Sequence, residues 1–356
     1  MNNNAKKRIV VKVGSNVLTR PNGKLDVTRM SAIVDQIAWL RQNGCEVILV
    51  SSGSIASGRS ELKVNKKLGS VEQRQLFSAV GQAKLISLYY DLFREYNIHA
   101  GQVLTMKESF GTRQEYLNQR ACMEVMLENG VIPIVNENDT VSVTELMFTD
   151  NDELSGLIAS MMGAETLIIL SNVDGIYNAD KQVIREIRTG ESVTQHIKTE
   201  KSSFGRGGML TKCHIARQVA EEGISVIIAN GKKENILIQL IKNPAETLHT
   251  RFLPNEEGIS NVKKWIAHSS SFAKGEVRIN TQAQKALLGK EATSLLMVGV
   301  TGIAGDFEEG DIIHIINENG EHIAIGRSGY SSEEARRLIG EHNVRPLVHY
   351  NYLYIE

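Results

Sequence analysis

Short apolar runs alternate with amphipathic stretches along the chain up to about residue 230. The runs occupy residues 9–13, 47–50, 131–135, 167–170 and 226–229, and a glycine shortly precedes each of the last four. Bounded apolar runs of this length favour buried strands, and a glycine before a strand suits the left-handed C-terminal cap of a helix. The pattern therefore predicts an α/β fold in which a mostly parallel open sheet is sandwiched by helices.

Apolar residues between the runs recur at helical spacing. The clearest stripe is formed by Met30, Ile33, Val34, Ile37 and Leu40. A longer helical pattern includes Leu76, Val80, Ala83 and residues 85–88, and Gly81 interrupts it. A glycine inside a helix often permits close packing against a neighbouring element, which is our interpretation of Gly81.

The residues that follow each predicted strand are the candidate site, because ligands bind at the carboxyl ends of the strands in such folds. Lys12 lies inside the first run, and Gly14 and Ser15 follow it. A buried ammonium group needs a partner, and this one could bind an anionic ligand beside the N–H groups of the glycine turn. A lysine that reaches from an edge strand to solvent would give the same pattern, so this run alone leaves both interpretations open.

Two polar clusters favour an amino-acid substrate. Residues 136–139 read Asn-Glu-Asn-Asp, and Asp139 could pair with an ammonium group while the amides donate to a carboxylate. Asp150, Asn151 and Asp152 open the next helix, where a single cap residue would be enough. Residues 140–148 between the clusters could form a flap. The Ser-Ser-Gly-Ser segment at 51–54 offers further donors, although an ordinary helix start has the same composition.

Two other segments suit a nucleotide. Residues 171–177 form a turn after a strand, and residues 204–212 place three glycines before a helix that carries Lys212. Backbone N–H groups in such a loop bind anions, and an anion would offset the unfavourable dipole around a lysine at a helix start. A flexible loop with a solvated lysine is the simpler alternative. Neither standard phosphate-binding motif is present, so the lysines, glycine turns and carboxylates favour phosphoryl transfer by positioning and charge neutralisation.

Composition narrows the class of protein. A chain of 356 residues, 42% of them hydrophobic, fits one large domain and a smaller one. The net charge of −1 favours neither nucleic acid nor an anionic membrane. Three scattered cysteines give no disulfide framework or zinc spacing, and no metal-ligand set is predicted. Because neither a signal core nor a membrane-length apolar run is present, the expected location is the cytoplasm.

Six short motifs, in this order, resemble the amino-acid kinase family. They are Val-Lys-Val-Gly-Ser-Asn, Ser-Ser-Gly-Ser-Ile-Ala, Ala-Val-Gly-Gln, Val-Asn-Glu-Asn-Asp, Asp-Asn-Asp-Glu-Leu-Ser and Gly-Gly-Met-Leu-Thr-Lys. The resemblance extends from residue 8 to about 266. Asn-Glu-Asn-Asp followed by Asp-Asn-Asp is similar to the branch of the family that phosphorylates the side-chain carboxylate of glutamate.

The resemblance implies an eight-stranded sheet and transfer of the ATP γ-phosphoryl group to L-glutamate, which gives L-glutamyl 5-phosphate for proline biosynthesis. It implies that Lys12 and Lys212 contact phosphoryl oxygens and that Asp152 orients them. The implied glutamate-binding residues are Ser52, Asp139, Asn151, Asn136 and Asp150. The implied ATP-binding residues are Lys12, Gly14, Ser15, Ser171, Asn172, Arg206, Gly207, Gly208, Met209, Leu210, Thr211 and Lys212. Mg²⁺ would be held largely by the nucleotide phosphates, L-proline would inhibit near the glutamate pocket, and a homodimer or homotetramer is expected.

Two residues depart from the family pattern, which usually has Asp in place of Asn172 and Thr in place of Arg206. Both positions face the nucleotide in the family, so the departures bear on nucleotide binding more than on the reaction. A related kinase that acts on N-acetylglutamate or aspartate is the alternative within this class.

The remainder of the chain, from about residue 275, has a different pattern of short apolar runs separated by glycine and acidic turns. Residues 299–302, 305–307 and 310–311 resemble the PUA module, which is small, mainly β and binds RNA in other proteins. We expect a kinase domain that binds ATP and glutamate at 1–260 and a PUA-like domain at 275–356. The latter has 7 Lys and Arg against 12 Asp and Glu, so its charge of −5 favours an appendage over the alternative of an RNA-binding regulator.

Overall fold

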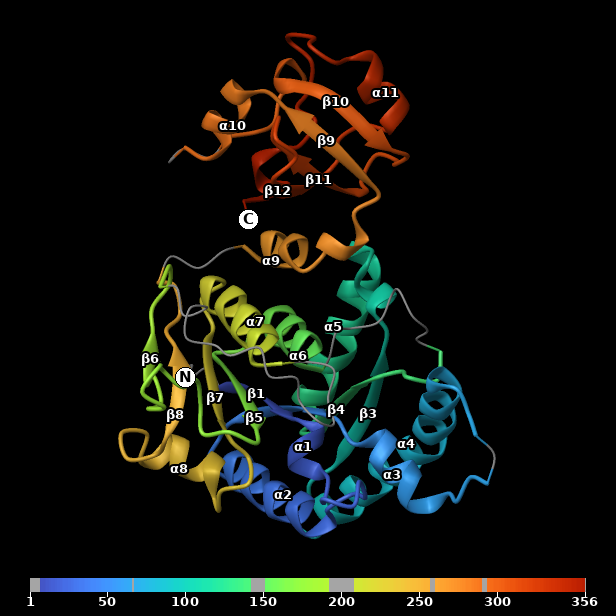
Figure 1. Ribbon diagram of the computed structural model, residues 1–356, viewed down its shortest axis with the longest axis vertical. Coiled ribbons are helices and arrows are strands. Elements are labelled where there is room, and N and C mark those ends of the chain that lie inside the picture. Colours follow the sequence, from blue (N-terminus) through green and yellow to red (C-terminus); the bar gives the residue numbers. More distant parts are fainter. Residues whose placement is uncertain are drawn as a thin grey trace. The chain divides into compact units, whose positions relative to one another are not determined.

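The computed structural model describes residues 7–65, 67–141, 151–191, 208–256, 260–289 and 293–355. The chain forms two compact units (Figure 1), of which the larger comprises Met1–Ser109 and Gln114–Gly258 and the smaller Phe110–Arg113 and Ile259–Glu356. The functional limits expected from the sequence, 1–260 and 275–356, stay a prediction. In the described part of the chain, no helix is long and apolar enough to cross a membrane.

The larger unit is built on a sheet with eight strands among its described residues. They are β1 (Arg8–Val13), β2 (Glu46–Ser51), β3 (Ala100–Thr105), β4 (Ile132–Glu137), β5 (Thr166–Ser171), β6 (Glu186–Ile187), β7 (Ser225–Asn230) and β8 (His249–Phe252). Their spatial order is β3-β4-β2-β1-β5-β7-β8-β6. All neighbouring pairs are parallel except β7 and β8, which confirms the predicted mostly parallel open sheet.

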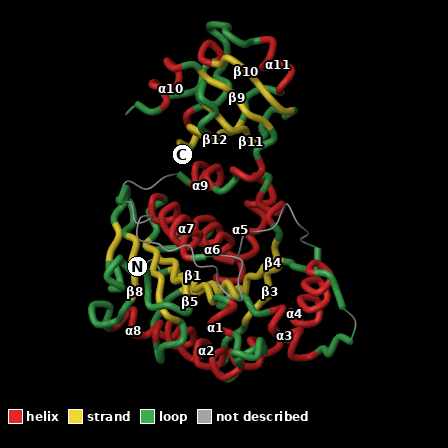
Figure 2. Tube along the Cα trace, in the orientation of Figure 1, coloured by secondary structure: helices red, strands yellow, loops and turns green. Residues whose placement is uncertain are grey.

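Helices cover both faces of this sheet (Figure 2). They are α1 (Ser15–Leu18), α2 (Val27–Gln42), α3 (Ser54–Glu61), α4 (Ser70–Arg94), the 3-10 turn η1 (Lys107–Phe110), α5 (Arg113–Glu128), α6 (Asn151–Met161), α7 (Met209–Glu221) and α8 (Ile236–Lys242). Figure 1 shows α2 and α8 on one face and α6 and α7 on the other. The predicted α/β sandwich is therefore confirmed.

The predicted helix ends are also confirmed. Gly44, Gly130, Gly163 and Gly223 have φ angles of 83°, 74°, 60° and 90°. Each of these values lies in the left-handed region that glycine adopts without the strain a Cβ would cause. Gly81 permits the close helix packing that was expected from the sequence. A Cβ there would lie 1.8 Å from the Ser54 carbonyl oxygen where α4 crosses α3.

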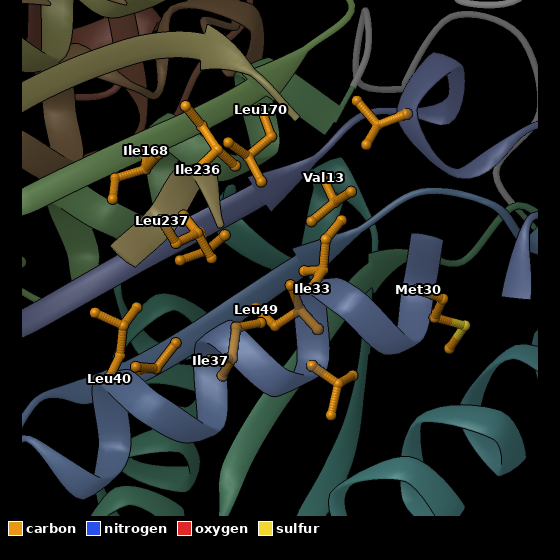
Figure 3. Close-up of a cluster of buried hydrophobic side chains, with 14 of the residues drawn as sticks. Val13, Met30, Ile33, Ile37, Leu40, Leu49, Ile168, Leu170, Ile236 and Leu237 are labelled. Atoms are coloured by element: carbon orange, nitrogen blue, oxygen red, sulfur yellow. The ribbon is translucent and has the colours of Figure 1, made fainter. Parts of the chain in front are cut away.

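The core beneath the sheet follows the predicted stripe of α2. Figure 3 shows Ile33, Ile37 and Leu40 among side chains of the strands and of α8: Val13, Leu49, Ile168, Leu170, Ile236 and Leu237; Met30, at the start of α2, belongs to the same buried cluster. The four α2 side chains are fully buried. Burial of an aliphatic side chain of this size stabilises the fold by about 1.5–3 kcal/mol, so this packing fixes α2 and β1 to each other.

The smaller unit has its own five-stranded sheet of order β10-β9-β11-β12-β13 among its described residues. Its elements are α9 (Asn261–Ala267), η4 (Ser270–Phe272), β9 (Gly275–Ile279), α10 (Thr281–Leu287), η5 (Met297–Gly299), β10 (Val300–Gly305), β11 (Ile312–Ile316), β12 (His322–Arg327), α11 (Ser332–Arg337), η6 (Tyr350–Tyr352) and β13 (Leu353–Ile355). β9 and β11 are parallel and the other pairs antiparallel. A separate apolar core, which includes Val277, Ile315 and Leu347, supports this sheet.

Candidate active site

The carboxyl edge of the larger sheet gathers the residues that follow its strands. Lys12 lies one residue before the end of β1, and its register partners are Val50 of β2 and Ile169 of β5. β1 is therefore a central strand, and Lys12 is only 4% exposed. The interpretation of Lys12 as an edge-strand lysine that extends into solvent is thus wrong.

A single carboxylate joins the two lysines that the sequence singles out. The Lys12 Nζ lies 2.5 Å from Asp152 Oδ1, and the Lys212 Nζ lies 2.8 Å from Asp152 Oδ2. Asp152 is fully buried, and it lies in the first turn of α6, where the helix dipole stabilises a carboxylate. Two ammonium groups around one carboxylate give these three residues a net positive charge, which suits an anionic ligand.

The turn after β1 keeps the space beside Lys12 open. The Gly14 N–H donates to the Leu170 carbonyl of β5 at 3.2 Å. A Cβ on Gly14 would lie 3.3 Å from that carbonyl oxygen and 3.4 Å from the Lys12 Nζ. A side chain here would crowd the ammonium group, whereas glycine lets the backbone approach it. Ser15, the other residue predicted for this turn, begins α1.

Three of the residues predicted to hold glutamate form one hydrogen-bonded network. Asn151 Nδ2 donates to Ser52 Oγ at 2.8 Å and to Asn136 Oδ1 at 3.0 Å. Asn136 Nδ2 in turn donates to Gln82 Oε1 at 2.9 Å. The network joins the ends of β2 and β4 to the start of α6 and the middle of α4, so these polar side chains are held in fixed orientations.

Asp139 lies beside a second group of polar residues. The Ser54 Oγ donates to Asp139 Oδ2 at 3.4 Å, and the Arg74 Nε is 3.8 Å from Asp139 Oδ1. Asp139 also lines a hollow of about 190 Å³. Other residues around this hollow include Ser78, Gln82, Gln102, Glu137 and Thr140. The residues around the hollow come from α4, from β3 and from the end of β4 with the turn that follows it.

Two residues of α4 belong to the site although the sequence pattern assigned them no role. Gln82 lies in a motif that carries the family resemblance, so a signal existed, but nothing in the pattern linked it to Asn136. Arg74 carries no such signal, because an arginine on a long helix is usually solvated. The contacts of both residues depend on the close crossing of α3 and α4 at Gly81.

The segments predicted to bind the nucleotide are described in part. Ser171 ends β5, and its Oγ donates to Asn172 Oδ1 at 3.4 Å. Gly208 precedes α7, whose first turn contains Met209, Leu210, Thr211 and Lys212. Asp150, Arg206 and Gly207 lie outside the described residues, as do residues 142–148 of the expected flap.

Two titratable groups near this edge have shifted pKa values. Burial would raise the pKa of the Asp174 carboxyl, but hydrogen bonds from Asn230 and Lys233 outweigh it and lower that pKa below its ordinary value. Burial raises the pKa of the Cys213 thiol to about 12, despite the nearby charges of Arg217 and Lys212. Cys213 is therefore a protonated thiol at neutral pH, which does not suit it to act as a nucleophile.

No group of three or more His, Cys, Asp or Glu side chains is close enough to hold a metal ion in the part of the chain that the structure describes. Both carboxylate oxygens of Asp152 contact lysine ammonium groups. Because lysines occupy both oxygens of Asp152, the site fits a magnesium ion bound through nucleotide phosphates better than one bound by Asp152.

Comparison with known proteins identifies the protein family to which the chain belongs. Residues 7–230 match the amino acid kinase family, and residues 275–350 match the PUA domain. The chain therefore belongs to the amino acid kinase family and carries a C-terminal PUA domain, as the sequence motifs predicted.

Individual relatives narrow this class. The chain is 62% identical to "Glutamate 5-kinase" of Bacteroides thetaiotaomicron over 98% of both chains. It is 47% identical to "Glutamate 5-kinase" of Chlorobaculum tepidum over 98% of this chain and 97% of the relative. The solved carbamate kinase from Giardia lamblia bound to AMP-PNP, at 17% identity and a TM-score of 0.51, covers 70% of this chain and 99% of its own. That likeness supports the fold alone.

Proposed function

We propose that this chain transfers the γ-phosphoryl group of ATP to the side-chain carboxylate of L-glutamate. The product is L-glutamyl 5-phosphate, and the reaction is the first step of proline biosynthesis from glutamate. Relatives that match nearly the whole chain carry the name of this activity. The observation on this chain that carries the proposal is the pair of lysines around Asp152 at the carboxyl edge of the sheet.

Lys12 and Lys212 act on the migrating phosphoryl group. Their ammonium groups contact the two oxygens of one carboxylate, so both border the same buried group. Phosphoryl transfer gains most of its rate from positioning and from stabilisation of charge on the phosphoryl oxygens. Asp152 orients the two lysines and offsets the repulsion between them, which would otherwise disfavour a buried and a partly buried ammonium group at one place.

The amide network and Asp139 hold the amino acid. Asp139 pairs with the substrate ammonium, because it is the carboxylate just beyond the end of β4 that lines the hollow. Ser52 and Asn136 donate hydrogen bonds to a substrate carboxylate, and Asn151, whose Nδ2 donates to both of them, holds them in place at the glutamate pocket. Asp150 is proposed to lie next to this group on the basis of the family resemblance.

ATP binds between the β1 turn, the end of β5 and the start of α7. The proposed contacts are Lys12, Gly14, Ser15, Ser171, Asn172, Arg206, Gly207, Gly208, Met209, Leu210, Thr211 and Lys212. The N–H groups at the start of α7 suit a phosphate, since a helix N-terminus attracts negative charge. When bound, Mg²⁺ supplies further neutralisation of phosphate charge and is coordinated mainly by the nucleotide.

The family resemblance supports further properties of the protein. We propose that L-proline inhibits the enzyme by binding near the glutamate pocket, and that the protein works as a homodimer or homotetramer. The cytoplasm is the proposed location, because both substrates are metabolites of the cell interior. The PUA domain is proposed to be a structural or regulatory appendage.

The test is a hydroxylamine-trapping assay together with ADP release. An acyl phosphate reacts with hydroxylamine to give a hydroxamate, so the assay distinguishes transfer to a carboxylate from hydrolysis of ATP. We expect hydroxamate that depends on ATP, Mg²⁺ and L-glutamate, and little with N-acetylglutamate or aspartate. Turnover with either of these two and none with L-glutamate would reject the proposal.

A further inference from the structure

The interface between α6 and α7 begins at the two helix starts that carry Asp152 and Lys212. Figure 1 shows the two helices side by side on the same face of the sheet, and they pack together along their length. On α6, Asp152, Gly156 and Ser160 are spaced four residues apart, so they share one face of the helix. This face starts with the carboxylate that contacts both lysines.

The facing side of α7 has a matching series. Lys212, Ile215 and Val219 recur at intervals of three and four residues, and Glu222 follows at the C-terminal cap. The seam between the helices, defined by these seven residues, has an ion pair at one end, apolar contacts in the middle and a polar contact at the other end.

Gly156 sets the spacing in the middle of the seam. A Cβ at Gly156 would lie 2.7 Å from Ile215 Cγ2 and 3.0 Å from Val219 Cγ2. Both partners are β-branched, and such side chains have one strongly preferred rotamer in a helix, so they cannot turn away without strain. Glycine is a poor residue for a helix interior, and the closeness of α7 gives a physical reason for its presence here.

The far end of the seam is held by a buried hydrogen bond. The Ser160 hydroxyl of α6 donates to Glu222 Oε2 at the end of α7, and both residues are 1% exposed. A buried carboxylate is costly to leave without hydrogen bonds, so this contact resists sliding of one helix along the other. The two helices are thus fixed both in separation and in register.

We propose that Gly156 is a positioning residue for the reaction. The close approach that it permits holds the start of α7 against the start of α6, and so keeps the Lys212 ammonium on Asp152 and at the transferred phosphoryl group. This inference rests on the proposed function, because it assigns Lys212 to that group.

The test is the variant Gly156→Ala, alone and combined with Ile215→Leu. The added methyl group pushes α7 away, and leucine removes the Cγ2 methyl that it meets while keeping the side-chain volume. A displacement of about 1 Å at a catalytic group can lower turnover roughly 10- to 100-fold. We expect such a loss of kcat in Gly156→Ala, with the KM for ATP and glutamate changed less than about threefold. We expect the double variant to regain most of the lost kcat relative to Ile215→Leu alone.

Val34→Ala is the matched control, because it weakens the buried core of the same unit on α2, away from the seam. It should lower the melting temperature at least as much as Gly156→Ala while kcat stays near the wild-type value. Unchanged kcat in Gly156→Ala, no recovery in the double variant, or an equal loss in the control would each overturn the inference.

Two further measurements cover the remaining outcomes. If Gly156→Ala does not fold, Ser160→Ala replaces it, with an expected loss of kcat of about threefold or more and little change in KM; unchanged kcat would count against the proposal. A crystal structure of the variant used should show that the contact between the Lys212 Nζ and Asp152 is lost, and an unchanged contact would overturn the inference. Absence of glutamate turnover in the wild type would instead reject the proposed function, which separates the two failures.

Discussion

The two ends of β1 carry ion clusters of opposite composition. At the amino end, one guanidinium serves two carboxylates, because Arg8 donates to Glu46 at 2.9 and 3.0 Å and to Glu124 at 2.8 and 2.9 Å. At the carboxyl end, two ammonium groups, those of Lys12 and Lys212, share the single carboxylate of Asp152. The three residues of the first cluster have an excess of negative charge, and the three of the second have an excess of positive charge.

The difference separates a structural cluster from a candidate site. The amino-end cluster also includes a hydrogen bond from Arg8 to the Met162 carbonyl, so its guanidinium is used fully by the protein. Burial would lower the pKa of Arg8, but hydrogen bonds to Glu124 and Glu46 raise it above its ordinary value, so the guanidinium remains charged within its cluster. The carboxyl-end cluster lies where glycine turns and polar strand ends meet, and its excess charge suits an anion. An ion cluster on a strand therefore indicates function only through its charge balance and its place on the sheet.

Removal of one lysine from the cluster at the carboxyl end of β1 should have the largest effect on kcat. We expect Lys212→Ala to lower kcat about 100- to 1,000-fold, because it removes one charge that stabilises the transition state. The measurement is steady-state ADP release at saturating ATP and glutamate, together with a thermal melt to show that the fold is intact.

A matched control for this lysine is Lys107→Ala. Lys107 pairs with Glu153, the residue after Asp152, at 2.9 Å, and its side chain is 12% exposed, close to the 13% of Lys212. It should keep kcat within about threefold of the wild type. A near-normal rate for Lys212→Ala, or an equal loss in both variants, would show that the lysine is misassigned.

Asp139→Ala tests the other half of the candidate site, with the next largest effect. We expect the KM for L-glutamate to rise about 10- to 100-fold, because an ion pair to the substrate ammonium is lost in a largely buried position. The KM for ATP should change little. Equal changes in both constants, measured by varying each substrate in turn, would place Asp139 elsewhere.

A substitution in the amino-end cluster should lower the stability of the protein and leave kcat unchanged. We expect Arg8→Met to lower the free energy of unfolding by about 2 kcal/mol, since two partly buried carboxylates lose their charged donor. Chemical denaturation measures this loss, and kcat for the folded variant should equal that of the wild type. A fall in kcat with unchanged stability would remove the distinction between the two ends.

The smallest expected change in stability comes from removing the charge of one of the two carboxylates in the amino-end cluster. Glu124→Gln keeps the shape of the side chain but removes one of the two negative charges around Arg8, so the guanidinium retains Glu46. We expect a loss of about 1 kcal/mol in the free energy of unfolding. A loss as large as that of Arg8→Met would mean that the cluster depends on Glu124 alone.

Much of the larger fold could be predicted from the sequence, and the missed strands lie toward the two sides of the sheet. The apolar runs identified the buried strands β1, β2, β4, β5 and β7, because strands covered on both faces must be apolar throughout. No such run marks β3, β6 or β8, which lie toward the two sides of the sheet. β3 is only partly buried along most of its length, and β6 has two residues, so neither leaves a clear pattern. Asn151 and Asp152, which were expected among the residues that open a helix, are the first two residues of α6.

The candidate site also contains residues that the sequence could identify and residues that it could not. The rule that ligands bind at strand ends singles out Lys12, Ser52 and Asn136 from the sequence alone, since these positions follow from local order along the chain. Gln82 and Arg74 could not be placed in that way, because each reaches the site from a helix. Their contacts depend on how α3 and α4 cross, and the crossing is a tertiary property that no local pattern specifies.

The most direct test of the paired lysines is a crystal structure of the protein with MgADP, aluminium fluoride and L-glutamate. Aluminium fluoride takes the place of the phosphoryl group in transit between donor and acceptor. We predict that the Nζ atoms of Lys12 and Lys212 both lie within hydrogen-bond distance of its fluorine atoms while each keeps its contact with Asp152. An aluminium fluoride group contacted by neither lysine, or by only one of them, would contradict this prediction.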